Sequence, residues 1–105
     1  MREGLEKLLA SGQDNALLRF GLGNAFFRDE NYAAAAAHLG RAAEHNPQYS
    51  AAWKLLGKAW LALGDQAQAE AAWQQGMQAA DANGDGQTVK EITVFLKRLH
   101  KNAAQ

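Results

Sequence analysis

Apolar positions along the chain recur at helical spacing, while β-branched residues are rare and no run alternates between apolar and polar residues. Near the start, Leu5, Leu8 and Leu9 fall at i, i+3 and i+4, and Gly12 follows them as a stop signal. The pattern predicts an all-α protein whose first helix lies within residues 1–12.

Polar turns divide the next stretch of the chain into four helices. The spacing predicts helices over about residues 15–28, 32–45, 51–63 and 66–80. Pro47 ends the second of these four, because the residue before a proline avoids helical torsion angles. Connections this short force neighbouring helices to lie antiparallel.

A last helix is predicted over residues 86–102. Its apolar stripe consists of Val89, Ile92, Leu96 and Leu99. Near its start, Thr88 and Glu91 have the three-residue spacing of a capping box, which satisfies backbone N–H groups at a helix N-terminus.

An internal repeat of thirty-four residues runs through the four central helices. At that offset the sequence matches Leu22-Gly23 to Leu56-Gly57, Phe26 to Trp60, Ala35 to Ala69 and Leu39 to Trp73. Glycine and alanine at helix crossings allow close approach, and large side chains fill the space that remains. Each helix pair also leaves one face for its neighbour, so the ends of such an array need caps.

This repeat resembles the tetratricopeptide repeat family. The family's unit carries in order a large residue, Leu-Gly, an aromatic, a small, a bulky and a small residue, and a proline. The second copy fills these places with Trp53, Leu56, Gly57, Trp60, Ala69, Trp73 and Gly76. The first copy has Leu22, Gly23, Phe26, Ala35, Leu39, Ala42 and Pro47. It departs from the pattern at Arg19, which replaces the first large residue.

The resemblance covers residues 16–83 directly and implies one domain over residues 1–105, built as a right-handed α-solenoid. Residues 16–49 and 50–83 would form two helix pairs, between an N-terminal helix over 1–12 and a capping helix over 86–102. If Thr93 occupies the same repeat position in the capping helix as Gly57 does in the second repeat, the capping helix is the first helix of a third repeat. That register needs two extra residues in the loop before it.

Composition and charge narrow the possible functions. The 105 residues suit one domain, and eleven basic residues balance eleven acidic ones. A neutral chain has no global field for nucleic acid or an anionic membrane, and the lack of cysteine excludes disulfides and thiolate metal sites. The sequence shows neither a signal peptide nor a membrane span, so we expect a soluble, cytoplasmic protein.

Candidate catalytic and metal-binding groups are few. Asp81, Asn83, Asp85 and Gly86 resemble the start of a calcium loop, but the twelfth position, which needs a bidentate carboxylate, holds Ile92. The histidines have no partner at metal-ligand spacing, and no glycine-rich phosphate loop is present. We therefore expect no catalytic residue, no metal and no cofactor, and a protein that is not an enzyme.

The resemblance also implies a concave face, lined by the first helix of each pair, that binds segments of other proteins. The residues it places there are Phe20, Asn24, Phe27, Arg28, Lys54, Lys58, Leu61, Lys90, Val94 and Lys97. The lysines among these residues favour an acidic partner, and the apolar residues favour a partner segment that is partly apolar. The alternative is that the lysines form an ordinary solvated surface without a binding role.

Two functions remain open at this point. The first is an adaptor that holds a segment of another protein in the lysine-lined groove, without binding nucleic acid or a membrane. The second is structural self-association, in which incomplete solenoid ends or exposed aromatic faces pair two copies as a homodimer.

Overall fold

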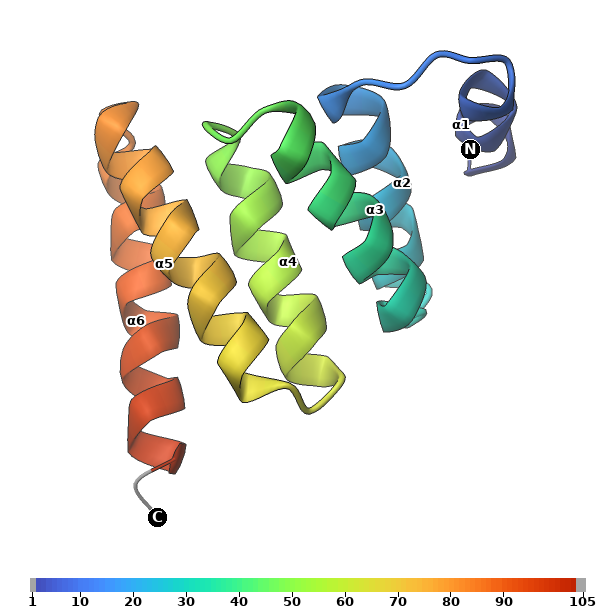
Figure 1. Cartoon of the computed structure of the whole chain (residues 1–105). Helices are drawn as coiled ribbons and strands as arrows, with labels where there is room; N and C mark the ends of the chain where they lie inside the picture. Colours follow the sequence, from blue (N-terminus) through green and yellow to red (C-terminus); the bar gives the residue numbers. More distant parts are fainter. Residues whose placement is uncertain (1, 104–105) are drawn as a thin grey trace.

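The computed structural model describes residues 2–103, and within them the chain forms six helices (Figure 1). These are α1 (Arg2–Ala10), α2 (Ala16–Arg28), α3 (Tyr32–His45), α4 (Ser50–Ala62), α5 (Gln66–Ala82) and α6 (Gly86–Ala103). None of them is long and apolar enough to cross a membrane. The architecture confirms the prediction of an all-α helical-repeat solenoid.

Polar caps and glycine turns set the helix boundaries. The side chains of Asn15, Asn31 and Asp65 each accept a hydrogen bond from the backbone N–H three residues further on. After α4 and α5, Gly64 (φ +84°) and Gly84 (φ +72°) take up left-handed torsion angles that glycine tolerates without strain. The chain can therefore reverse direction within three residues at these points.

The start of α6 differs from the predicted capping box. Asp85 caps this helix, since its carboxylate accepts hydrogen bonds from the backbone N–H of Thr88 at 3.1 Å and from the Thr88 hydroxyl at 2.6 Å. Glu91 turns away from the helix terminus and pairs with Lys54 at 3.1 Å. A carboxylate one residue before the helix is the stronger cap, and it leaves Glu91 free to contact another repeat.

Neighbouring helices pack in the order in which they occur. α2 with α3 and α4 with α5 form antiparallel pairs, α3 packs against α4, and α6 packs against α5 and more lightly against α4. Figure 1 shows α1 and α6 at opposite ends of the array. Among the described helices α1 packs on α2 alone, and it buries no residue, so it is the most loosely held element.

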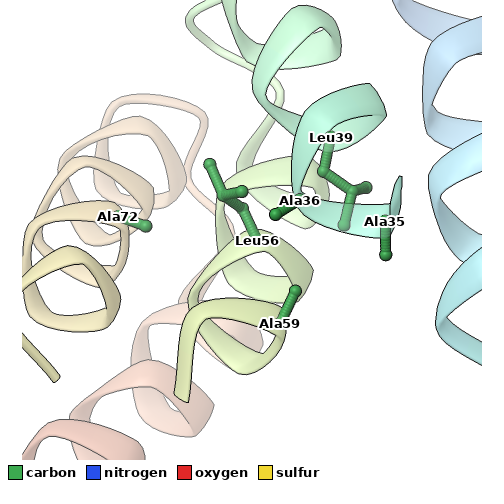
Figure 2. Close-up of a cluster of buried hydrophobic side chains, with 6 residues drawn as sticks. All are labelled: Ala35, Ala36, Leu39, Leu56, Ala59 and Ala72. Atoms are coloured by element: carbon green, nitrogen blue, oxygen red, sulfur yellow. The ribbon is translucent and has the colours of Figure 1, made fainter. Parts of the chain in front are cut away.

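Small side chains fill the core between the two helix pairs. Figure 2 shows four alanines from α3, α4 and α5 around two leucines; the cluster consists of Ala35, Ala36, Leu39, Leu56, Ala59 and Ala72. Partly buried aromatic rings surround it. Because alanine is a strong helix former and takes little room, these helices approach closely without losing intrinsic stability.

Glycines in α2 and α4 permit the closest helix contacts. A Cβ at Gly23 would lie 2.5 Å from the side chain of Leu39, and one at Gly57 would overlap the indole of Trp73. Trp73 is 2% exposed, and its Nε1 donates a hydrogen bond to the carbonyl oxygen of Lys54 at 3.0 Å. The second repeat therefore requires glycine at this crossing.

We expect Gly57→Ala to lower the free energy of unfolding by about 1–3 kcal/mol, because the added methyl group must displace a buried indole. Gly40→Ala in α3 is the matched control, since a Cβ there meets nothing within 4 Å. It should raise the unfolding free energy by about 0.5–1 kcal/mol through helix propensity. Urea unfolding followed by circular dichroism measures both, and similar effects of the two substitutions would contradict the packing argument.

Candidate partner-binding site

The first helices of the repeats form one continuous face. α2 contacts α4, and α4 contacts α6, although these helices are separated in sequence by α3 and α5. The residues predicted to bind a partner lie on these three helices. A binding site on this face would therefore be shared between repeats.

A hollow of about 370 Å³ opens on this face between α4 and α6, near their C-terminal ends. Its lining consists of Lys58, Leu61, Gln66, Trp73, Phe95, Arg98, Leu99 and Asn102. Trp73 and Leu99 are buried and form its floor, while Lys58 and Arg98 are exposed at its rim. The hollow thus combines an apolar interior with positively charged edges.

Aromatic and charged groups interact across the mouth of the hollow. The Phe95 ring lies 5.3 Å from the Trp73 ring, and the Lys58 ammonium lies 5.1 Å from the centroid of Phe95. Closer to the start of α4 and α6, Lys54 Nζ lies 3.1 Å from a carboxylate oxygen of Glu91, and this carboxylate neutralises the charge of Lys54. Positive charge on this side of α4 is therefore available at Lys58 rather than at Lys54.

The two phenylalanines predicted for the groove pack within the first repeat. Phe20 is half-buried, and its ring lies 5.0 Å from that of Tyr49. Phe27 is also half-buried and meets Tyr32 edge to face at 5.2 Å. Each ring thus offers only part of its surface to a partner.

The other predicted residues reach the surface at different places. Exposed or half-buried positions outside the hollow are held by Asn24, Arg28, Lys90, Val94 and Lys97. Of the ten predicted residues, the structure brings Lys58 and Leu61 together in the hollow. A binding role for the rest of the predicted face stays a prediction.

The α6 side of the hollow consists of Phe95, Arg98, Leu99 and Asn102, and sequence reasoning placed none of them in the site. α6 turns Glu91 and Phe95 toward α4, one position further along than the predicted Lys90 and Val94. The available signal was the spacing of Glu91, Phe95 and Arg98, because residues at i, i+4 and i+7 share one helix face.

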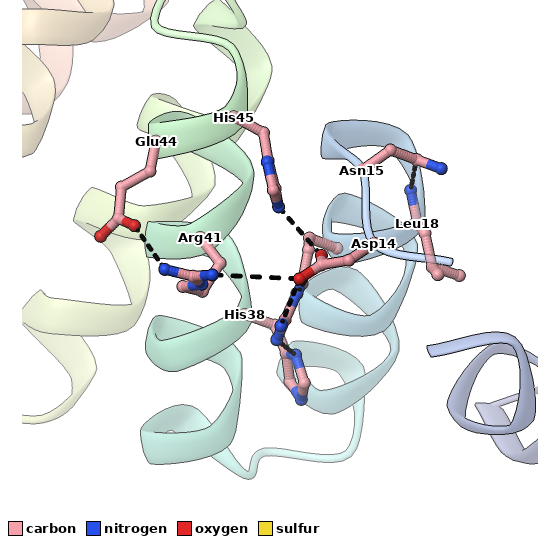
Figure 3. Close-up of polar contacts among 8 residues, drawn as sticks. Asp14, Asn15, Leu18, His38, Arg41, Glu44 and His45 are labelled. Atoms are coloured by element: carbon pink, nitrogen blue, oxygen red, sulfur yellow. Dashed lines mark hydrogen bonds and ion pairs between the residues drawn. The ribbon is translucent and has the colours of Figure 1, made fainter. Parts of the chain in front are cut away.

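A polar cluster ties the loop before α2 to the end of α3 (Figure 3). Both carboxylate oxygens of Asp14 accept hydrogen bonds from Arg19, at 2.8 and 3.0 Å, and His45 Nε2 lies 2.9 Å from Oδ1. Arg19 holds the repeat position of Trp53, whose indole donates to the carbonyl oxygen of Pro47 at 2.9 Å. In both repeats this position anchors the helix to the loop before it.

Arg19 also controls the protonation of its neighbours. Its hydrogen bonds hold the pKa of Asp14 well below the usual range of a carboxyl group. His38 stacks on Phe26 with ring centroids 5.4 Å apart, and its Nδ1 lies 3.1 Å from Nη1 of Arg19. Burial and the charge of Arg19 lower the pKa of His38, so the neutral ring accepts a hydrogen bond from the guanidinium.

Two residues of the segment that resembles the start of a calcium loop make structural hydrogen bonds. Asn83 Nδ2 donates a hydrogen bond to the carbonyl oxygen of Gln48 at 2.8 Å, and Asp85 caps α6. Within residues 2–103, no group of three or more His, Asp or Glu side chains is arranged to hold a metal ion.

Known proteins share this arrangement. A family model described as Tetratricopeptide repeat matches residues 2–39 and 20–85. The chain belongs to the tetratricopeptide repeat family. It is 55% identical over 101 residues to the TPR repeat-containing protein PA0015 of Pseudomonas aeruginosa, which corresponds to 96% of each chain.

Solved structures agree with the tetratricopeptide fold. The solution structure of protein BPP2914 from Bordetella parapertussis has 48% sequence identity and a TM-score of 0.84, with 99% of this chain and 90% of that chain covered. A crystal structure of MamA shares the fold at 24% identity with a TM-score of 0.69, covering 99% of this chain and 70% of that chain. Tetratricopeptide repeat proteins are protein–protein interaction or scaffold modules and are generally not enzymes.

The Asp14 cluster predicts a specific pH dependence of stability. Because the folded pKa of Asp14 lies below its unfolded value of 3.8, its contribution is present above about pH 4 and is lost as the pH falls further. Asp14→Asn should lower the midpoint of thermal unfolding at pH 7, and its difference from the parent should shrink at pH values below 3.8.

Asp81→Asn is the control for this experiment, since it removes an exposed carboxylate of α5 that makes no ion pair within the described residues. Its thermal midpoint should follow that of the parent across the same pH series. A gap between Asp14→Asn and the parent that stays constant down to the lowest pH would refute the assigned role of the carboxylate.

Proposed function

We propose that the hollow between α4 and α6 binds an acidic, partly apolar segment of a partner protein. The observation that carries this proposal is the position of Lys58 and Arg98 at the rim of a hollow floored by Trp73 and Leu99. Neither cation pairs with a carboxylate within the described residues. A partner carboxylate would meet both charges while an adjacent apolar side chain enters the hollow.

The size and chemistry of the hollow support a peptide side chain as its occupant. Its volume of about 370 Å³ lies at the lower end of the range of ligand pockets, roughly 300–1,000 Å³. Apolar burial would supply most of the affinity, at about 25 cal/mol per Å² of apolar surface removed from water. The rim charges would select acidic partners and speed their capture.

The local distribution of charge makes this selection possible in a neutral chain. Glu91 neutralises Lys54, so the positive edge is concentrated at Lys58 and Arg98. Lys58 also lies over the face of Phe95, which holds the ammonium near the mouth of the hollow. A carboxylate arriving there finds a cation that is already positioned.

A longer partner segment would extend from the hollow along the rest of the face. On one side it would follow α4 toward α2, where Phe20, Asn24, Phe27 and Arg28 lie. On the other side it would reach the outward positions of α6 at Lys90, Val94 and Lys97. These residues would add contacts at the margin, whereas the hollow supplies the anchor.

We expect Lys58→Glu and Arg98→Glu each to weaken binding of a short fluorescein-labelled peptide of alternating Glu and Leu, measured by fluorescence anisotropy. Each substitution replaces a rim cation by a carboxylate that repels the glutamates of the peptide. Each variant should therefore bind the peptide at least about tenfold more weakly at low salt. Raising the salt concentration should weaken the parent's binding and leave the residual binding of the variants little changed.

Lys7→Glu in α1 is the matched control, because it makes the same charge change on an exposed residue outside the lining of the hollow. It should bind the peptide as the parent does. A peptide with Lys in place of Glu should bind poorly to all forms. Equal losses in Lys7→Glu and Lys58→Glu would place recognition in net charge and overturn the proposed site.

A further inference from the structure

The helices of the chain are of two kinds that alternate along the array. α2, α4 and α6 are first helices of a repeat, and α3 and α5 are second helices. α1 is also a second helix by register, because Leu5, Leu39 and Trp73 are spaced by thirty-four residues. It runs antiparallel to α2, since Arg2 pairs with Asp29 just beyond the end of α2.

The outer face of α6 has the features of a first helix without its second helix. A hollow of about 430 Å³ lies there between α5 and α6, lined by Gln74, Met77, Gln78, Asp81, Val89 and Leu96. In the preceding repeat, the equivalent of Leu96 is Trp60, which packs against the core clusters. Leu96 keeps part of its surface open, as do Met77 and Val89.

At the opposite end of the molecule, α1 has the features of a second helix without its first helix. Leu8 of α1 is 42% exposed, whereas Ala42 and Gly76, which follow at intervals of thirty-four residues, are buried. A Cβ at Gly76 would lie 2.9 Å from the Cβ of Trp53 in α4, so this position faces the first helix of its own repeat. In α1 that first helix is missing among the described residues.

We infer that a second copy of this chain docks its α1 on the outer face of α6, so that α6 and the incoming α1 together complete a third repeat. Each end of the molecule then supplies the helix that the other end lacks. The contact buries Leu8 of one copy against the hollow of Met77, Val89 and Leu96 of the other. It joins two different surfaces, so it propagates head to tail and does not close at two copies.

Thr93 keeps this joint looser than the repeats within one chain. It stands where Gly23 and Gly57 stand in the two preceding first helices, and its hydroxyl donates a hydrogen bond to the carbonyl oxygen of Val89 at 2.7 Å. Leu39 and Trp73 pack against glycines that have no side chain, whereas an incoming helix would meet the branched side chain of Thr93. The assembly is accordingly reversible and depends on concentration, as small interfaces are.

Light scattering over a concentration series tests the inference. The weight-average mass of the parent should rise above the 11.4 kDa of one chain and continue past two copies as concentration increases. Leu8→Glu blocks the α1 surface and Val89→Glu blocks the α6 surface, so each variant alone should stay at 11.4 kDa. Circular dichroism checks that both variants retain the helicity of the parent.

Mixing the two blocked variants gives the decisive result. Leu8→Glu retains an intact α6 surface and Val89→Glu retains an intact α1 surface, so a mixture should form one-to-one pairs of about twice the monomer mass and nothing larger. Lys58→Glu, in the other hollow, should assemble like the parent, which separates this inference from the proposed peptide site. Thr93→Ala should move assembly to lower concentration.

Three outcomes would overturn the inference. A parent that remains at the mass of one chain at every concentration would exclude the joint. A parent that stops at two copies would indicate a symmetric pairing instead. Blocked variants that fail to pair when mixed, or that still assemble alone, would show that α1 and α6 are not the contacting surfaces.

Discussion

The contact between Trp73 and Gly57 positions much of the C-terminal half of the molecule. Without a side chain at Gly57, the indole reaches the backbone of α4, where the carbonyl oxygen of Lys54 accepts its N–H. An unsatisfied buried N–H would cost about 1–3 kcal/mol, so the hydrogen bond fixes the orientation of the ring as well as its depth. The same ring supports Phe95 and floors the hollow, so a core contact also shapes the candidate site.

One position of the repeat performs the same structural task with two different chemistries. Trp53 reaches back to the carbonyl oxygen of Pro47, while Arg19 reaches back to the carboxylate of Asp14. The first uses an aromatic ring that packs against the core, and the second uses a bidentate ion pair near the surface. The departure from the family pattern at Arg19 is therefore a replacement that keeps the anchor between helix and loop.

The hollows that α6 shares with α4 and with α5 have different chemistry because they lie on different sides of this helix. The hollow shared with α4 has Lys58 and Arg98 at its rim and aromatic rings inside, which suits an acidic peptide segment. The hollow shared with α5 has an aliphatic interior edged by glutamines and Asp81, which suits a helix packed as in a repeat. A short solenoid can thus present a partner site and an assembly surface without competition between them.

Local sequence determined the helices, their order and the repeat, because apolar spacing, polar caps and glycine turns act within a few residues. It also indicated that glycine at helix crossings allows close approach, while the structure showed that Leu39 meets Gly23 and Trp73 meets Gly57. Only the tertiary structure decided which face of α6 meets α4, and with it the roles of Glu91, Phe95 and Arg98 in the candidate site. A rotation of α6 about its axis by one residue position would leave its pattern of apolar spacing unchanged. The packing of Trp73 and Ile92 between the helices selects the orientation of α6.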